Sequence, residues 1–103
     1  MDCVFCKIIN KEEPTELVYE SDNFIVVKDI KPSAPVHLLI IPKKHIKSVI
    51  EVKPEDKELM GEMILTAQKV AQENKIGSYR LRINTGRGAG QIIDHIHMHL
   101  FSW

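Results

Sequence analysis

The feature that most constrains the fold is a stretch near the C-terminus in which three histidines alternate with apolar residues, His95-Ile96-His97-Met98-His99-Leu100-Phe101. Alternation with a period of two is typical of a β-strand, so the sequence predicts imidazoles on one face and apolar side chains on the other. A half-buried strand that merely tolerates histidine is the simplest alternative. Three titratable side chains on one face argue against such a merely structural strand, because each imidazole needs a polar partner. The histidine face is therefore the candidate functional site.

The spacing limits what these histidines can bind. On an extended strand the side chains of His95 and His99 lie about 13 Å apart, at about 3.3 Å per residue, whereas a zinc–nitrogen bond is about 2 Å long. One metal ion therefore cannot bind all three. Two neighbouring histidines can share an ion, or each can have a separate task, and the pattern leaves both alternatives open.

The composition fits one small domain spanning residues 1–103, for which burial in an oligomer would add stability. Lys plus Arg and Asp plus Glu both total 14, and no basic block favours nucleic acid as a partner. No apolar segment approaches the about 20 residues of a membrane span, and the N-terminus does not resemble a signal peptide. We therefore expect a soluble, cytoplasmic protein that binds neither nucleic acid nor membranes.

Both cysteines lie in the segment Cys3-Val4-Phe5-Cys6, whose apolar spacing predicts a short helix that ends near Asn10. A disulfide between them would close a very small loop and stabilise little. A redox pair is a second interpretation, but no strand precedes the motif as in thioredoxin-like proteins. Zinc binding is favoured, and two buried thiols are the alternative.

The N-terminal half predicts three strands. Two β-rich runs, 17–20 and 24–29, flank the turn residues 21–23 and predict a hairpin. After a proline-containing loop, residues 36–41 form a nearly continuous apolar run that Pro42 ends. Such a run is typical of a strand in the centre of a sheet.

One long helix is predicted from Pro54 to about Lys75, ending near Gly77. Its apolar stripe consists of Leu59, Met63, Ala67 and Val70. Residues 79–84 alternate again, which predicts a strand with Leu81 and Ile83 toward the helix and Arg82 and Asn84 away from it.

A glycine-rich turn, residues 85–91, leads back to the histidine strand. If the two flanking strands pair, Asn84 shares the histidine face. The backbone N–H groups of such a turn can bind phosphate oxygens. The turn is not a dinucleotide fingerprint, because a strand follows it where a helix should begin. A flexible hairpin loop is the alternative.

Taken together, these segments resemble the histidine triad (HIT) superfamily, in its nucleotide-binding, purine nucleoside phosphoramidase branch. The resemblance rests on the alternating triad, on Gly90-Gln91 and Asn84 before it, and on Asp29-Ile30-x-Pro32 and Ala34-Pro35-x-His37. It covers the chain from Cys3 to about Phe101. The resemblance implies an α+β fold: an antiparallel sheet of about five strands, one long helix, a short N-terminal helix, and a homodimer in which two sheets join.

The resemblance also implies an enzyme, a hydrolase that binds a purine nucleotide such as AMP or GMP. Such proteins cleave the α-phosphorus from an amine or another leaving group through a covalent nucleotidyl-histidine. His97 matches the nucleophile, and neutral imidazole suits that role because its ordinary pKa is about 6.5. His99 and Asn84 match the positions at the phosphate, and Asp29 matches the one that binds ribose hydroxyls. Gly90 and Gln91 match the nucleotide-binding turn.

Two further residue sets come from the same comparison. Residues that match the base pocket are Phe5, Ile8, Val18, Phe24 and Ile30, although the sequence alone would place them in the core. Residues that match a closed, structural zinc site, one per chain, are Cys3, Cys6, His45 and His95.

The chain departs from the family pattern at two places. Ile92 stands where many phosphoramidases carry a serine near the leaving group, and isoleucine cannot give a proton to a departing amine. The sequence ends at Trp103, where relatives continue with a glycine pair and a tail, so specificity conferred by the tail is not carried over. The alternatives are a dinucleoside polyphosphate hydrolase or nucleotidyltransferase, a nucleotide-binding scaffold with little turnover, and a zinc-stabilised interaction domain.

Overall fold

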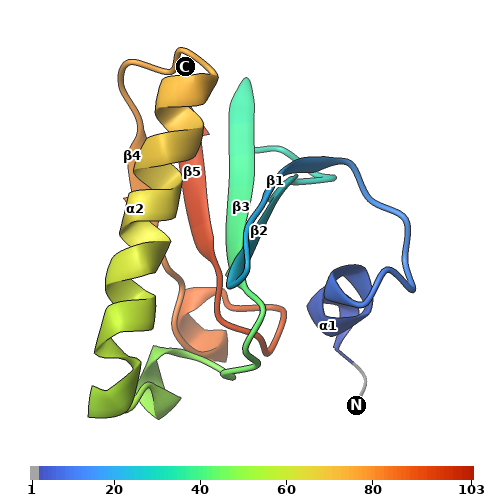
Figure 1. Ribbon diagram of the computed structural model, residues 1–103, viewed down its shortest axis with the longest axis vertical. Helices are drawn as coiled ribbons and strands as arrows, with labels where there is room; N and C mark the ends of the chain where they lie inside the picture. The colour runs from blue at the N-terminus through green and yellow to red at the C-terminus, as the bar shows by residue number, and fades with distance from the viewer. Residues whose placement is uncertain (1–2) are drawn as a thin grey trace.

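The computed structural model describes residues 3–103 and shows two helices and five strands (Figure 1). In chain order they are α1 (Val4–Ile9), β1 (Leu17–Glu20), β2 (Phe24–Lys28), β3 (Val36–Pro42), α2 (Lys57–Glu73), β4 (Arg80–Arg82) and β5 (Met98–Ser102). Short 3-10 turns cover Val49–Glu51, Pro54–Asp56 and Arg87–Ala89. The predicted α+β architecture, with one long helix and a short N-terminal helix, is confirmed.

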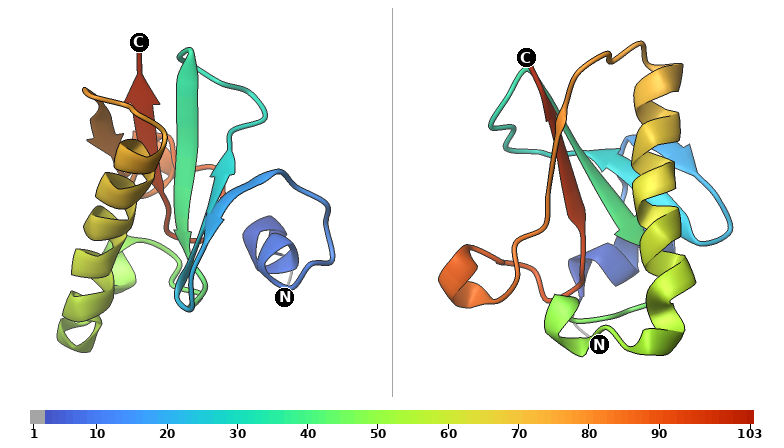
Figure 2. Two further views of the ribbon diagram at one scale, coloured as in Figure 1. Left: turned by 45° about the horizontal axis from the view of Figure 1, so that its top comes forward. Right: turned by 90° about the vertical axis from the view of Figure 1, so that its left-hand side faces the viewer.

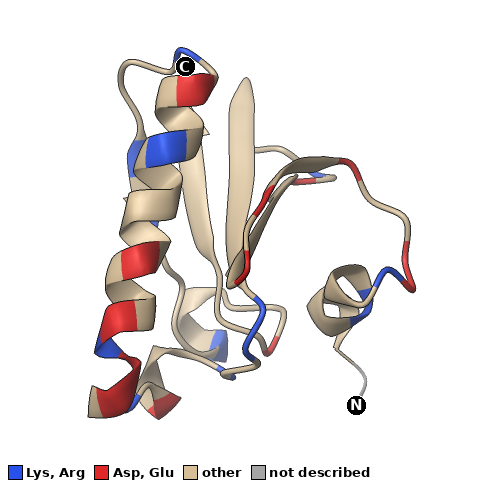
Figure 3. Cartoon of the chain, viewed as in Figure 1, with Lys and Arg blue, Asp and Glu red and all other residues tan. Residues whose placement is uncertain are grey.

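The strands form one five-stranded sheet in the order β1-β2-β3-β5-β4. All four pairings are antiparallel. The apolar run of β3 lies at the centre of the sheet, as its sequence predicts, and the hairpin of β1 and β2 lies at one edge. Figure 3 shows that β3 and β5 carry no charged residue, whereas α2 and the loops carry charges of both signs. Both uncharged strands have a neighbouring strand on each side.

Each face of the sheet is covered by a helix, because the alternation along the strands divides the core into two clusters (Figures 1 and 2). On one face Met63 and Val70 of α2 pack with Ile40 and Leu100 of the sheet. On the other face α1 contributes Phe5, together with the residues Ile25, Val27, Leu39 and Ile41 of β2 and β3. The short helix α1 thus completes a second core and stands beside the face that carries the histidines.

The long helix begins and ends slightly inside the predicted bounds. Pro54–Asp56 form a 3-10 turn before it, and the buried Asp56 carboxylate accepts a bond from Lys53 N at 3.0 Å and pairs with Lys44 Nζ at 2.6 Å. At the other end Asn74 Nδ2 donates to Val70 O at 2.8 Å, and Lys75 has a left-handed φ of 57°. The helix therefore stops before Gly77. No helix within residues 3–103 is long and apolar enough to cross a bilayer.

The histidine strand is shorter than predicted. β5 begins at Met98, and residues 95–97 lie in an irregular segment. The reason is that Ile96 N bonds to Ile46 O at 2.7 Å, in the loop after β3, and not to a strand. The alternation survives this irregularity, because Ile96, Met98 and Leu100 all pack in the α2-side core. Likewise β4 covers only Arg80–Arg82 of the strand predicted over 79–84.

Candidate functional site

A cavity of about 490 Å³ opens on the histidine face of the sheet, beside α1. It brings together eight residues expected at the site: Phe5, Ile8, Asp29, Ile30, Asn84, Gly90, His97 and His99. They come from α1, from the loop after β2 and from the segments around β4 and β5. We refer to this cavity as the triad cleft.

Two residues expected in the base pocket lie elsewhere. Phe24 is fully buried in the core under α2, and Val18 packs against that same core. Alternation explains the difference, because Phe24 and Val26 face α2, whereas Ile25 and Val27 face α1.

The glycine-rich turn holds its shape through two side chains. Gln91 is 3% exposed and does not line the triad cleft. Its amide accepts from Gly86 N at 2.9 Å and donates to Lys47 O at 2.7 Å. Arg87 donates to the carbonyl of Gln91 at 2.7 Å and to that of Ile92. Gly90 lines the cleft with a φ of 91°, a conformation that favours glycine. Gln91 therefore supports the glycine-rich turn from its buried side and not from the side of the triad cleft.

The tautomer of His97 follows from its one ring hydrogen bond. Its Nδ1 lies 2.8 Å from the carbonyl oxygen of His95. A carbonyl only accepts, so the proton is on Nδ1 and Nε2 keeps a free lone pair. Burial lowers the pKa of His97, against the opposing effect of the His95 carbonyl. The ring is therefore neutral at pH 7 and can act as a nucleophile through Nε2.

The tautomer of His99 is set through a relay. Ser33 N donates to His37 Nδ1 at 3.0 Å, so the proton of a neutral His37 is on Nε2. That Nε2 lies 2.8 Å from His99 Nδ1, which must then accept. The proton of His99 is consequently on Nε2. A carboxylate oxygen of Asp29 lies 3.4 Å from His37 Nε2 and favours a proton there.

The Nε2–H of His99 is a donor in need of a partner. Among the buried side-chain nitrogen and oxygen atoms of residues 3–103, it alone has no hydrogen bond. Burial, and then the nearby His97, His37 and Arg82, lower the pKa of His99 to about 4, so the ring is neutral at pH 7. A buried donor without an acceptor is costly. An anionic oxygen in the triad cleft would satisfy it.

His37 has no assigned role in the sequence analysis. It lies on β3 opposite Phe101 of β5 and lines the cleft. The signal that would have found it is the period-two alternation of β3, combined with the pairing of β3 and β5. Only the register places His37 beside His99.

The four residues expected to bind metal form one cluster. Their donor atoms all lie within 4.8 Å of one another. His95 Nδ1 lies 3.3 Å from Cys3 Sγ and 3.1 Å from His45 Nδ1, and Cys6 Sγ lies 3.3 Å from His45 Nδ1. Tetrahedral zinc with bonds of about 2.0–2.3 Å places its ligands about 3.3–3.8 Å apart. The donor set and its spacing therefore fit a metal.

The protonation of the cluster also fits a metal. His95 Nε2 lies 2.7 Å from the carbonyl of Pro42 and carries the proton, so the lone pair of Nδ1 points toward the sulfurs. Burial is the main cause that lowers the pKa of His95 to about 4. Burial, followed by the neighbouring Cys3, raises the pKa of Cys6 to about 11. A bound cation would stabilise the thiolate form of both cysteines in this cluster.

Comparison with known proteins agrees with this geometry. The family profile described as "Scavenger mRNA decapping enzyme C-term binding" matches residues 2–103. The purine nucleoside phosphoramidase of Escherichia coli (strain K12) is 44% identical over 101 residues, which are 96% of this chain and 85% of that protein. The chain belongs to the histidine triad (HIT) family.

Solved HIT structures share the fold. A HIT family hydrolase from Legionella pneumophila Philadelphia 1 superposes with a TM-score of 0.95 at 44% identity, covering 98% of this chain and 92% of that one. A zinc-bound HIT family protein from Mycobacterium smegmatis gives 0.82 at 33% identity, covering 98% of this chain and 74% of that one. The expectations of a HIT fold and of a hydrolase are confirmed.

Proposed function

We propose that this HIT protein is a nucleotidyl hydrolase that cleaves purine nucleoside 5′-phosphoramidates, or related nucleoside monophosphate esters and anhydrides. The observation that carries the proposal is the pair of tautomers in one cleft. His97 offers a lone pair on Nε2, and His99 offers a donor on Nε2. A nucleophile beside an oxyanion donor is the arrangement that attack on phosphorus needs.

The cleft can bind the nucleotide in three parts. Phe5, Ile8 and Ile30 give it an apolar wall suited to a purine base. Asp29 accepts a bond from Lys31 N at 2.8 Å through one carboxylate oxygen and can accept from ribose hydroxyls through the other. Asn84 and His99 can donate to the phosphate oxygens. Gly90 lets the backbone approach the phosphate closely.

The reaction then runs in two steps. Nε2 of His97 attacks the α-phosphorus, a phosphorus–nitrogen bond forms, and the bond to the leaving group breaks with its electron pair. The His97 ring carries a positive charge in the intermediate, which the carbonyl of His95 stabilises through the Nδ1 proton. Water next attacks phosphorus, the bond to His97 breaks, and a nucleoside monophosphate is released. A departing amine takes its proton from water, since Ile92 has none to give.

We further propose one structural zinc per chain, held by Cys3, Cys6, His45 and His95. The spacing of the donors and the zinc-bound mycobacterial relative support this assignment. Four protein ligands leave no open position, so the metal would supply stability and no chemistry. Metal analysis of protein purified without added zinc would give about one equivalent per chain, and free thiols without metal would contradict the site.

The two unbridged cysteines also support a cytoplasmic location.

We also propose a homodimer in which two sheets join. β4 is an exposed edge of the sheet, and Leu81 on it is 38% exposed. Ile64 and Leu65 on α2 are 54% and 61% exposed, large values for apolar residues. A second copy would pair the edge and cover these side chains. Light scattering of wild type and Leu65→Glu tests this, with a dimer expected only for wild type; a wild-type monomer would refute it.

A second candidate function is a nucleotide-binding protein with little turnover. Ile92 favours it, because this residue lines the triad cleft, is 82% exposed and offers no proton to a leaving amine. The two candidate functions predict different rates of substrate turnover but the same affinity for a nucleoside monophosphate.

One experiment separates the candidates. A fluorogenic adenosine 5′-phosphoramidate is incubated with wild type and with His97→Ala, and AMP binding is measured for both by calorimetry. We expect turnover by wild type only, and a mass increase of one adenylyl group in rapidly quenched wild type. AMP binding without turnover would support the second candidate. Neither binding nor turnover would reject both.

A further inference from the structure

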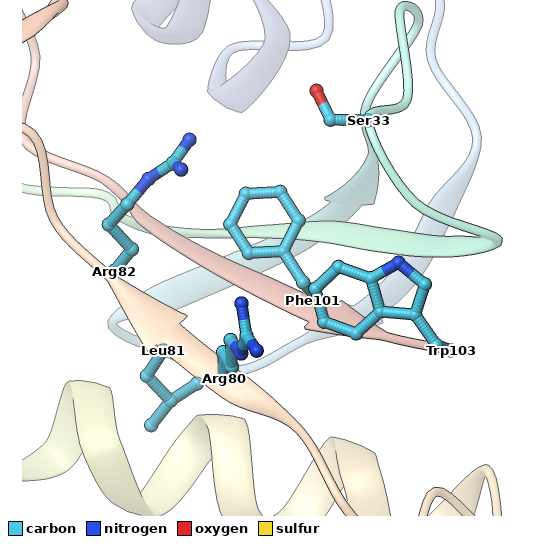
Figure 4. A pocket seen from close by; sticks show the side chains of 6 residues that line it. All are labelled: Ser33, Arg80, Leu81, Arg82, Phe101 and Trp103. Atoms are coloured by element: carbon cyan, nitrogen blue, oxygen red, sulfur yellow. The ribbon is translucent and has the colours of Figure 1, made fainter.

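The chain has three arginines, and two of them belong to β4. Arg80 and Arg82 line a cavity together with Phe101 and Trp103 (Figure 4), on the edge proposed above to contact a second copy. The third, Arg87, lies in the 3-10 turn of the glycine-rich segment and does not line the triad cleft. The reaction described above gives Arg87 no task.

The side chain of Arg87 bends back over the segment that follows it. Its Nη1 donates to the carbonyl of Gln91 at 2.7 Å and to that of Ile92, and its Nη2 pairs with Asp94 at 3.0 Å. We call these three contacts the Arg87 clip. Both charged side chains are exposed, so the ion pair by itself contributes little to stability. It does fix the plane of the guanidinium over the two carbonyls.

The clip determines where two backbone N–H groups point. All peptide bonds here are trans, so the carbonyl of one residue and the N–H of the next point in opposite directions. Because the carbonyls of Gln91 and Ile92 point toward Arg87, the N–H groups of Ile92 and Ile93 point away from it. Both isoleucines line the triad cleft and Arg87 does not, so the cleft lies on the side to which these N–H groups point.

These two N–H groups are free donors. Neither Ile92 N nor Ile93 N forms a hydrogen bond within residues 3–103, whereas Gln91 N donates to Gly86 O at 3.1 Å. Successive free N–H groups in a turn form a concavity that binds anionic oxygens. A cation bonded to a carbonyl also polarises that peptide, which strengthens its N–H as a donor.

We propose that Arg87 is a positioning residue, whose clip aligns the N–H groups of Ile92 and Ile93 as an oxyanion hole for the phosphate in the triad cleft. This inference rests on the proposed function, since it places that phosphate beside His97 and His99. Donors that are aligned in advance stabilise the transition state without a cost of reorganisation. Ile92 thus serves through its backbone, which is independent of its missing hydroxyl.

A purely structural role for Arg87 predicts a different pattern of losses. If the clip only stabilised the loop, its removal would weaken the binding of adenosine, AMP and a transition-state analogue in equal proportion. A positioning role leaves adenosine unaffected, because adenosine has no phosphate. It affects the transition state most, because misaligned donors cost more there than in the ground state.

Two variants of Arg87 test the role. Arg87→Met keeps a long side chain and removes every donor, whereas Arg87→Lys keeps donors and the charge. Lys11→Met is the matched control, because Lys11 pairs with Glu20 at 2.8 Å and is 59% exposed against 63% for Arg87, but lies outside the triad cleft.

The measurements use three ligands and one substrate. Calorimetry gives the affinity for adenosine, for AMP, and for adenosine with orthovanadate, which forms a five-coordinate analogue of the attacked phosphorus. Amide NMR of isotope-labelled protein follows the N–H groups of Ile92 and Ile93. Turnover is measured with a fluorogenic adenosine 5′-phosphoramidate.

In wild type and Lys11→Met we expect AMP to move the amide proton resonances of Ile92 and Ile93 downfield, as a hydrogen bond to an anion does. Arg87→Met should lower kcat/KM and the affinity for adenosine with vanadate about 10- to 100-fold, the cost of misplaced groups in a reacting site. Its affinity for AMP should fall less than about tenfold, and that for adenosine should stay unchanged. Arg87→Lys should recover part of each loss.

The other outcomes separate this proposal from the proposed function. AMP that binds wild type and moves neither amide resonance would overturn the positioning role and leave the proposed function intact. Equal losses for all three ligands in Arg87→Met would assign the clip to loop stability and overturn the positioning role as well. If AMP moves both resonances in wild type but not in Arg87→Met, and no substrate is turned over, the positioning role stands and the proposed function fails. If AMP does not bind, both fail.

Discussion

A single backbone N–H decides how His99 can act. Ser33 N donates to Nδ1 of His37, His37 Nε2 donates to Nδ1 of His99, and the last proton of the relay, on His99 Nε2, has no partner within residues 3–103. The relay works only while both rings are neutral, and burial keeps the pKa of each below its ordinary value. A positioning role for His37 therefore follows from geometry alone.

Removal of His37 tests the relay. We expect His37→Leu to lower kcat/KM for an adenosine phosphoramidate about 10- to 100-fold, the range found for groups that orient a ligand or a reacting residue. His37→Gln, whose amide can both accept and donate, should recover part of the loss. Nitrogen NMR of His99 should show the Nε2–H tautomer in wild type and a mixture in His37→Leu. An unchanged tautomer together with unchanged kinetics would contradict the relay.

The Ile92 side chain lines the triad cleft and has no proton to donate. We expect Ile92→Ser to raise turnover of substrates with alkylamine leaving groups about tenfold or more, because a hydroxyl can pass a proton to the amine. Substrates whose leaving group departs as an anion should change little. The melting temperature should stay the same, since the side chain is 82% exposed. Ile92→Val is the control that changes size without adding a donor, and equal rates for Ser and Val would reject this role.

At the scale of elements, local signals were sufficient for most of the structure. The alternation of β5 and the apolar run of β3 each carry their own pattern, so the sheet and the triad face could be predicted. The paired cysteines favour a metal, but His45 and His95 are added to them only by the family resemblance. What could not be predicted depends on contacts between distant segments. The start of β5 is set by the bond of Ile96 to Ile46, and the places of His37 and Arg82 by strand register. The family resemblance matches Phe24 to the base pocket, whereas Phe24 lies in the core under α2, where the sequence alone would place it. Because β2 is buried on both faces, its sequence does not show which face lines the cleft.

The helix α1 carries two of the four proposed metal ligands. Cys3 is its N-cap residue, Cys6 lies in its first turn, and Cys3 Sγ accepts a bond from Cys6 N at 3.3 Å. We expect Cys6→Ser, or removal of metal by a chelator, to lower the melting temperature by about 10 °C or more, since metal-binding energy becomes folding energy at such sites. Addition of zinc should restore the chelated wild type and not the variant. Thermal unfolding by circular dichroism, unchanged by chelation, would contradict this dependence.

At the scale of the whole molecule, the buried His99 couples stability to pH. The pKa of His99 is lowered to about 4 in the folded protein, below the ordinary 6.5 of the unfolded chain. Between these values the unfolded state binds protons that the folded state does not, so the free energy of unfolding falls as pH falls.

Urea unfolding at pH 7, 6 and 5 measures this slope. His99 should contribute up to about 1.4 kcal/mol per pH unit. His99→Gln should reduce the dependence of the free energy of unfolding on pH by the equivalent of about one bound proton. Acid also displaces the metal, which likewise lowers the free energy of unfolding. A free energy of unfolding that stays constant from pH 6.5 to 4.5 would contradict the prediction.

The short helix α1 has a consequence for how ligands influence one another. It carries Cys6 of the metal cluster and, within the same two turns, Phe5 and Ile8 of the triad cleft. If the ion orders this helix, the ion strengthens nucleotide binding by a certain factor. Thermodynamic reciprocity then requires the nucleotide to strengthen metal binding by that same factor in affinity. If the ion is the proposed zinc, a cell short of zinc would lose it first from copies of the protein that hold no nucleotide.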